Sequence, residues 1–255
     1  MSKVIYDVTR KQLTLLDARL YFFDDGSFVP SCTTYLSCYP KGPEYYEWLK
    51  KYGKESDDIR DAQGHKGSNV HKLCEDYDNG QEISILRLDG SLQYTMAEWS
   101  HFEKYVEFSR KFNPVIHSNE QTLLSKKYKV GLTLDRIMTI GSTNILIDIK
   151  TSNNLWDHMW LQLAACKKVY EDEMSKSKNK VEIHKVGILW LAAKTRSDGK
   201  KDTIQGKGWQ LVLRDVDEEE KDWELFQVTQ RLWEAQNGDM KPKNLTYQLS
   251  HKKIA

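Results

Sequence analysis

The strongest constraint on the fold is the stretch from Val130 to Ser152, VGLTLDRIMTIGSTNILIDIKTS. Two apolar segments flank Gly141-Ser142, a pair of residues typical of a tight hairpin turn. A turn centred between them places Asp135 directly opposite Asp148 in an antiparallel pair. Lys150 follows two positions later and projects from the same face as Asp148. The stretch therefore predicts a hairpin with two carboxylates and one ammonium group on one face.

Two carboxylates so placed need a compensating charge, because directly opposite Cβ atoms lie only about 4.5 to 5.5 Å apart. A divalent cation such as Mg²⁺ or Mn²⁺, which prefers oxygen ligands, would supply it. Alternatively, both aspartates face solvent and Lys150 is a surface counter-charge. The apolar context ILIDIK argues against this alternative, since a central strand rarely tolerates unpaired charges. A slip of one residue would move one aspartate to the other face.

The remaining pattern predicts an α/β (α+β) protein with a central mixed sheet flanked by helices. We expect one domain over residues 1–255, with an N-terminal strand and helical region over about 1–114 and a catalytic core over about 115–237. Strands are expected in the first thirty residues and over 115–125, 128–139, 144–150, 186–193 and 208–214. Helices are expected over 43–52, 56–77, 95–113, 155–174 and from Asp217 to before Gly238.

Bulk properties narrow the class of protein. The chain has no apolar run of about 18 residues and no apolar N-terminal signal, so we expect no membrane partner. We expect a cytoplasmic protein of a bacterial cell or of a phage-infected host. The four cysteines show no CxxC spacing, which predicts reduced, mostly buried thiols and neither a zinc site nor an iron-sulfur cluster. The net charge is +1, so any basic surface is local, as in the lysine-rich stretch from Lys176 to Lys207. That stretch equally fits an ordinary solvated surface.

Four short motifs occur in a fixed order along the chain. They are GSNVH at Gly67–His71, GLTLD at Gly131–Asp135, DIKT at Asp148–Thr151, and Gln162 with Ala164 and Ala165. This series resembles the RecB-like branch of the PD-(D/E)XK nuclease superfamily. The opening VPSCTTYLSCYPKGPEYYEWLKKYG is similar to the start of phage exonucleases and of the mitochondrial genome maintenance exonucleases, so the resemblance spans roughly residues 28 to 170.

The resemblance implies a restriction-endonuclease-like core and a Mg²⁺-dependent deoxyribonuclease, with Mn²⁺ able to substitute. It implies an exonuclease on single-stranded DNA or DNA ends that leaves 5′-phosphate and 3′-hydroxyl groups. The implied metal ligands are His71, Asp135, Asp148 and the main-chain carbonyl of Ile149. Lys150 would lie beside the attacking water and the scissile phosphate. Gln162 would orient the substrate, and Thr151 is a candidate DNA contact.

Two positions depart from the family pattern. Cys166 stands where the helix motif often carries a tyrosine, so any aromatic contact must come from elsewhere. The usual double glycine before the second-strand aspartate is reduced to Gly131, with Leu132 following. We therefore expect a less close approach of the backbone at that point.

Several residues keep two interpretations. Taken alone, His71 would more often be a core histidine, but the other motifs favour a metal ligand. Glu120 either orients a ligand or has only a structural role. Ser31, Thr33 and Thr34 either bind phosphate near a helix start or cap that helix.

The aromatic residues after the first strands and the overall activity also keep alternatives. The aromatic side chains could stack on bases, or their helix could bury them in the core, which the pattern slightly favours. These residues are Tyr35, Tyr39, Tyr45, Tyr46 and Trp48. The rival to a nuclease is a catalytically inert nucleic-acid-binding or assembly protein that keeps the fold. The intact set of Asp135, Asp148 and Lys150 argues against this rival.

Overall fold

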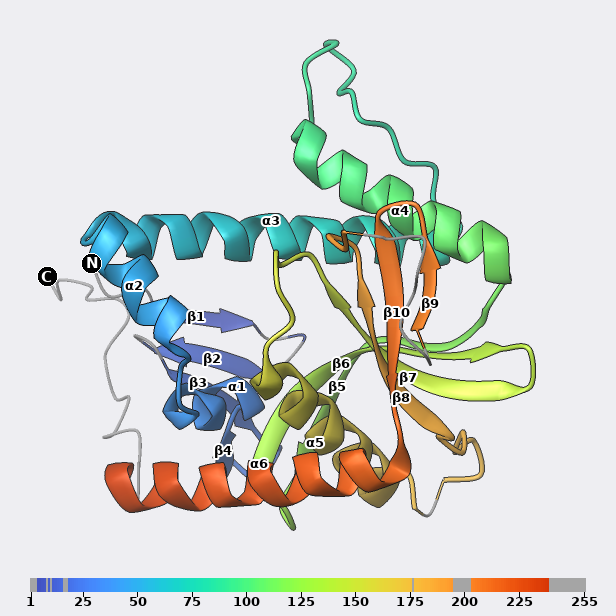
Figure 1. Cartoon of the computed structure of the whole chain (residues 1–255). Helices are drawn as coiled ribbons and strands as arrows, with labels where there is room; N and C mark the ends of the chain where they lie inside the picture. Colours follow the sequence, from blue (N-terminus) through green and yellow to red (C-terminus); the bar gives the residue numbers. More distant parts are fainter. Residues whose placement is uncertain are drawn as a thin grey trace, which may run out of the picture.

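The structure, a computed structural model, has the predicted mixed architecture of a six-stranded sheet with helices on both faces (Figure 1). It describes residues 4–7, 9, 11–15, 18–175, 177–194 and 203–238. Lys176 and residues 195–202 of the predicted basic stretch lie outside the described residues. No helix in the described ranges is long and apolar enough to cross a membrane.

The six-stranded sheet contains the predicted hairpin near its middle. Neighbouring strands run antiparallel except β7 and β8, which run parallel because helix α5 (Asp157–Glu173) crosses between them. The strand order across the sheet is β5 (Val115–Ser125), β6 (Val130–Ile140), β7 (Thr143–Lys150), β8 (Lys185–Trp190), β10 (Trp209–Arg214) and β9 (Thr203–Gly206).

The register of the hairpin follows the prediction. Ile140 pairs with Thr143 beside the turn, and the ladder continues in step to Arg136 and Ile147. Gly141 adopts a φ of +60°, the left-handed conformation that glycine accommodates without strain. The paired ladder ends at Arg136 and Ile147, so the predicted pair of Asp135 and Asp148 lies one step beyond it.

Strand β7 separates two apolar cores because its side chains alternate. Ile147 and Ile149 pack with helices α3 (Glu55–Asp78) and α4 (Met96–Phe112). Leu146 packs on the other face with α5 and α6 (Val216–Asn237). Figure 1 shows α3 and α4 along the upper edge and α6 along the lower edge. By this alternation Asp148 and Lys150 belong to the α5 face.

A second, four-stranded antiparallel sheet precedes the first helices. Its strands are β1 (Val4–Asp7), β2 (Gln12–Leu15), β3 (Ala18–Phe22) and β4 (Phe28–Pro30). This sheet meets the core at Gly131, which forms a bridge to Ser31 directly after β4. A Cβ atom at Gly131 would lie 2.5 Å from the ring of Tyr21, so only glycine fits there. The expectation of a less close backbone approach is therefore wrong at this glycine, although Leu132 lies buried beside it.

The helix ends mostly follow their capping signals. Thr95 and Glu98 form the predicted capping box of α4, and Asn113 ends that helix in the left-handed conformation. The cap of α6 is Asp215 with Glu218, two residues before the predicted start at Asp217. Both spacings satisfy a capping box, and the end of β10 at Arg214 selects the earlier one.

Helix α3 departs from the prediction in its first half. The three- and four-residue spacing of Ile59, Gln63, Gly67, Val70, Cys74 and Tyr77 predicts one inward face along the helix, but of these positions only Val70 and Cys74 are buried. Ile59 is half-buried and Gln63 is exposed. The first half fails to enter a core because Gln63 and Gly67 line a cavity instead.

The aromatic residues divide between two environments. Tyr35, on the short helix α1 (Cys32–Tyr35), is buried and donates a hydrogen bond to the carbonyl of Lys129. A 3-10 turn, η1 (Leu36–Cys38), follows it. Helix α2 (Pro43–Tyr52) has no buried residue, so the core interpretation is wrong for Tyr45, Tyr46 and Trp48, which are half-buried or exposed. Tyr39 is half-buried.

The four cysteines are free thiols, as predicted. Three are buried and Cys38 is half-buried. Burial raises the pKa of the Cys32 and Cys166 thiols, which keeps them protonated and unreactive at neutral pH. Cys166 packs in the core on the α5 face, so it does not occupy the aromatic role that the family's tyrosine would have.

Candidate metal centre

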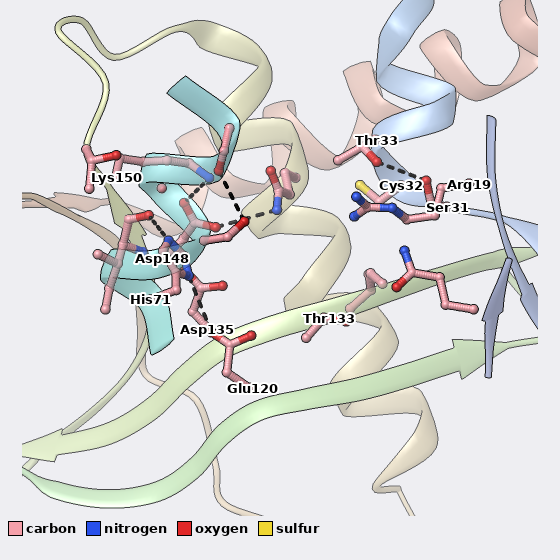
Figure 2. A pocket seen from close by; sticks show the side chains of 18 of the residues that line it. Arg19, Ser31, Cys32, Thr33, His71, Glu120, Thr133, Asp135, Asp148 and Lys150 are labelled. Carbon is pink, nitrogen blue, oxygen red and sulfur yellow. Dashed lines mark hydrogen bonds and ion pairs between the residues drawn. The ribbon is translucent and has the colours of Figure 1, made fainter. Parts of the chain in front are cut away.

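A cavity of about 400 Å³ opens where α3, the β6–β7 hairpin, α5 and the N-terminal sheet meet (Figure 2). Nearly all predicted site residues line this cavity, although they come from distant parts of the chain. They are Ser31, Thr33, His71, Glu120, Asp135, Asp148, Ile149, Lys150, Thr151 and Gln162. Thr34 is the exception among them.

The side chain of Asp135 accepts the hydrogen bond that would continue the hairpin ladder. The backbone N–H of Ile149 donates to Asp135 Oδ2 at 2.7 Å, in place of a main-chain acceptor on β6. This bond fixes the carboxylate beside the end of β7 and also satisfies a buried backbone donor. The two strands separate at this point, so side chains from both faces of the sheet can reach the same space.

His71 reaches this space from α3. Its Nε2 lies 2.9 Å from the carbonyl oxygen of Ile149, and its Nδ1 lies 3.3 Å from Glu120 Oε1 and 3.5 Å from Asp135 Oδ2. Burial alone would lower the pKa of His71, but the carboxylates of Asp135 and Glu120 raise it overall. The histidine therefore joins the two carboxylates and the main-chain carbonyl that the resemblance implies as a ligand.

Glu120 is the site residue whose position sequence patterns did not reveal. Its φ is +48°, rare for a residue with a side chain and costing about 1 to 3 kcal/mol. The β5–β6 pairing passes from Asn119–Arg136 to Gln121–Leu134 without a Glu120–Asp135 step. The unusual backbone turns Glu120 toward His71, and ligand atoms of Glu120, His71 and Asp135 all lie within 4.8 Å of one another.

A buried network of Arg136, Asp78 and Tyr105 contacts Glu120. Arg136 is fully buried, and its guanidinium contacts Glu120 Oε1 at 3.4 Å and Asp78 Oδ2 at 2.8 Å. The hydroxyl of Tyr105 donates to the same Asp78 carboxylate at 2.6 Å. Burial raises the pKa of Asp78, and the nearby Arg136 guanidinium offsets part of this rise. This network connects α3, α4 and β6 to the glutamate.

Asp148 and Lys150 form a second, adjoining part of the site. Lys150 Nζ lies 2.6 Å from Asp148 Oδ2, and Gln162 Nε2 lies 3.5 Å from Asp148 Oδ1. The lysine approaches Oδ2 as an ion-pair partner without the geometry of a hydrogen bond, so that buried oxygen has no hydrogen-bond donor within the described residues. Burial, together with the Asp135 carboxylate, raises the pKa of Asp148 to about 6.

The hydroxyl groups near α1 have separate roles. Ser31 caps α1 by accepting from the Thr34 N–H, which supports the capping interpretation. Thr34 is buried and exchanges hydrogen bonds with the backbone of Arg19, so it ties α1 to β3. Thr33 is exposed and faces the cavity, where Ser31 and Thr151 also contribute.

The donors fit a divalent cation. Two carboxylates and one imidazole converge within 4.8 Å, and the Asp148 carboxylate, one oxygen of which is buried without a hydrogen-bond donor among the described residues, lines the same cavity. Carboxylate and carbonyl oxygens favour Mg²⁺ and Mn²⁺, and an imidazole nitrogen is accepted by Mn²⁺ and other transition ions. The converging group includes Glu120, whose role the sequence left open, and does not include the predicted ligand Asp148, whose carboxylate pairs with Lys150.

Comparison of the chain with models of known protein families finds no match, and comparison with curated protein sequences finds no similar protein. The functional argument therefore rests on the residues and geometry of the cavity.

Proposed function

We propose that this protein is a metal-dependent DNA nuclease of the PD-(D/E)XK type, whose motifs resemble those of the RecB-like branch. One observation carries the proposal. The ligand atoms of His71, Glu120 and Asp135 converge within 4.8 Å beside the Asp148–Lys150 pair, in a cavity open to solvent. A group of acidic side chains and a lysine around one cation is suited to attack on a phosphodiester by water.

The side chains of the cavity have separate roles in the proposed reaction. Asp135, Asp148 and His71, with the Ile149 carbonyl, would hold Mg²⁺ or Mn²⁺, and Glu120 either joins them or fixes the His71 ring. The bound ion would polarise a phosphoryl oxygen and lower the pKa of water. Lys150 offers three N–H donors and no lone pair, so it orients the attacking water and stabilises negative charge on the phosphate. Gln162 positions the phosphate or the Asp148 carboxylate.

The proposed substrate is DNA with free ends, above all single-stranded DNA. The expected products carry 5′-phosphate and 3′-hydroxyl ends. The exposed Tyr46 and the half-buried Tyr45 and Trp48 of α2 support a single-stranded substrate, because unpaired bases can stack on aromatic side chains at a surface.

The test uses the full chain with end-labelled linear DNA, circular DNA and RNA, each in Mg²⁺, in Mn²⁺ and in EDTA. We expect metal-dependent release of short products from linear single strands and little cleavage of circles. Asp135→Asn and Asp148→Asn should abolish cleavage, whereas Asp217→Asn on exposed α6 should not. The alternative of an inert DNA-binding protein predicts DNA binding without cleavage in every metal.

A further inference from the structure

The cavity has a second wall that no sequence motif indicates. Across from the carboxylates, the N-terminal sheet contributes Gln12, Arg19 and Tyr21 to the lining. Figure 2 shows the guanidinium end of Arg19 pointing into the cavity, toward the side where His71 and Asp148 lie. This wall belongs to the sheet that docks on Gly131, so its position relative to the metal centre is fixed by close packing.

Arg19 differs from the other cations of the cavity. Lys150 is paired with Asp148, and Lys72 is paired with Glu75 and Asp76. The guanidinium of Arg19 has no ion-pair or hydrogen-bond partner in the part of the chain that the structure describes. Its backbone is anchored, because its N–H donates to Thr34 Oγ1 at 3.0 Å and its carbonyl accepts from the Ser31 N–H at 2.8 Å.

Gln12 adds a neutral polar group to the same wall. Only 9% of this residue is exposed, and no hydrogen bond joins its side-chain amide to another described residue. The amide is not among the buried polar atoms that lack a partner, so it opens to the cavity, where it can donate to a ligand. The amide lines the same cavity as Arg19.

We propose that Arg19 and Gln12, with the hydroxyl of Thr33, form a phosphate-binding subsite for a second phosphate of the nucleic-acid substrate. This inference rests on the proposed nuclease function and names how the substrate strand is held. Arginine suits the role because its planar donors match two phosphate oxygens at once. The uncharged amide and hydroxyl add donors without repelling the anion.

The charge distribution of the cavity supports this division. Carboxylates of Glu120, Asp135 and Asp148 gather on one wall, where they favour a cation and repel an anion. On the opposite wall the free guanidinium attracts an anion. A strand that placed one phosphate at the metal centre would thereby bring a neighbouring phosphate toward Arg19. That second phosphate is either a terminal 5′-monoester or an internal diester.

The experiment measures binding of fluorescent single-stranded oligonucleotides in EDTA, so that it does not depend on cleavage. The variants are Arg19→Gln and Gln12→Leu, and Arg110→Gln at an exposed position of α4 is the matched control. We expect Arg19→Gln to weaken binding about 10- to 100-fold, as for loss of a charge-assisted hydrogen-bond pair. The dependence of the binding constant on salt concentration should also become shallower, because the variant neutralises one phosphate fewer.

Two substrate arms identify the phosphate. A loss confined to 5′-phosphorylated oligonucleotides indicates the terminal monoester, and an equal loss with 5′-hydroxyl oligonucleotides indicates an internal diester. Unchanged affinity and salt dependence in Arg19→Gln would overturn the subsite, as would a parent protein that binds no oligonucleotide. Metal affinity and melting temperature of Arg19→Gln should match the parent, which excludes general misfolding as the cause.

The outcomes also separate this inference from the proposed function. A parent that cleaves DNA with the same KM and kcat as Arg19→Gln would refute the subsite and leave the nuclease intact. A parent that binds oligonucleotides through Arg19 but cleaves none in any metal would refute the nuclease and leave the subsite intact.

Discussion

At the scale of single residues, Asp148 and Lys150 form a buried pair whose charges depend on each other. Burial penalises both charged forms, but each partner lies 2.6 Å from the other and compensates it. Burial alone would lower the pKa of Lys150, yet the carboxylates of Asp148 and Asp135 raise it. The lysine is therefore a cation at neutral pH, able to donate hydrogen bonds but unable to accept a proton.

This state of Lys150 leads to a sharp expectation. Lys150→Ala should leave metal binding intact or tighter, because it removes a positive charge beside the ligands. The chemical step should fall by about two to four orders of magnitude, the range for losing a positioned charge-stabilising group. Single-turnover cleavage at saturating Mg²⁺ measures that step, and Lys127→Ala, which removes an exposed ion-paired lysine, is the control. A Lys150→Ala protein that cuts at the parent rate would contradict the mechanism.

His158 gives a pH dependence that is separate from the metal ligands. Burial, with the ammonium groups of Lys41 and Lys150, lowers its pKa from the ordinary 6.5 to about 4. The unfolded chain therefore takes up a proton between about pH 6.5 and 4 while the folded chain does not, so stability falls as the pH falls through this window.

We expect the parent to lose about 1 kcal/mol more unfolding free energy than His158→Gln between pH 7.5 and pH 5, after allowing for solvent screening. Urea denaturation at the two pH values measures the difference. His65→Gln, at an exposed position of α3, controls for the loss of a histidine as such. Equal pH dependence in the parent and in His158→Gln would show that this imidazole ionises freely in the folded state.

At the scale of elements, the hairpin was the most predictable part of the molecule. Its register follows from the short turn at Gly141 and from the alternation of apolar residues, which are both local signals. The same reasoning placed Asp135, Asp148 and Lys150 together. It could not show that Asp135 would bond to the Ile149 N–H, because that contact depends on where the two strands separate.

Other parts of the site depend on contacts that local patterns do not encode. The left-handed backbone of Glu120 interrupts an otherwise regular strand pattern, and its sequence neighbours give no sign of it. Arg19 and Gln12 reach the cavity only because the N-terminal sheet packs across β6. The first half of α3 reads as amphipathic, but its inner face lines a cavity where a core was predicted.

The contact between the two sheets can be tested at Gly131. Gly131→Ala places a methyl group 2.5 Å from the Tyr21 ring, so the N-terminal sheet must shift or the ring must leave its position. We expect a loss of about 1 to 3 kcal/mol in unfolding free energy, typical of overpacking. Hydrogen exchange should become faster in β3 and β4.

The matched control for this variant is Gly64→Ala. Gly64 lies in α3 with nothing within 4 Å of an added Cβ, and alanine should stabilise the helix by about 0.5 to 1 kcal/mol. A Gly131→Ala protein as stable as Gly64→Ala would mean that the N-terminal sheet is not held at this glycine.

At the scale of the whole molecule, the cavity is assembled from elements that lie far apart along the described chain. The N-terminal sheet, α1, α3, the hairpin and α5 each supply lining residues, and the Arg136 network connects α4 to the same place. The centre brings together the carboxylates of Glu120, Asp135 and Asp148 from three neighbouring strands, which repel one another when no cation is bound. A bound cation should consequently stabilise the fold as a whole, and not only order the side chains around it.

Because of this coupling, binding of a cation should raise the melting temperature of the protein. A ligand present at 100 times its Kd stabilises the folded state by about 2.7 kcal/mol, which raises the Tm of a chain of this size by about 5 to 10 °C. We expect such a rise in the parent with Mn²⁺, and a much smaller one in Asp135→Asn and Asp148→Asn, because an amide keeps the shape but loses the charge attraction. Each variant is compared with itself in EDTA, so that changes in its metal-free stability cancel. Asp217→Asn, exposed at the start of α6, should show the full parental rise. Calorimetric titration with Mn²⁺ must report the same order of affinities. If both site variants gain as much Tm as the parent, the cation binds somewhere other than between His71 and the hairpin aspartates.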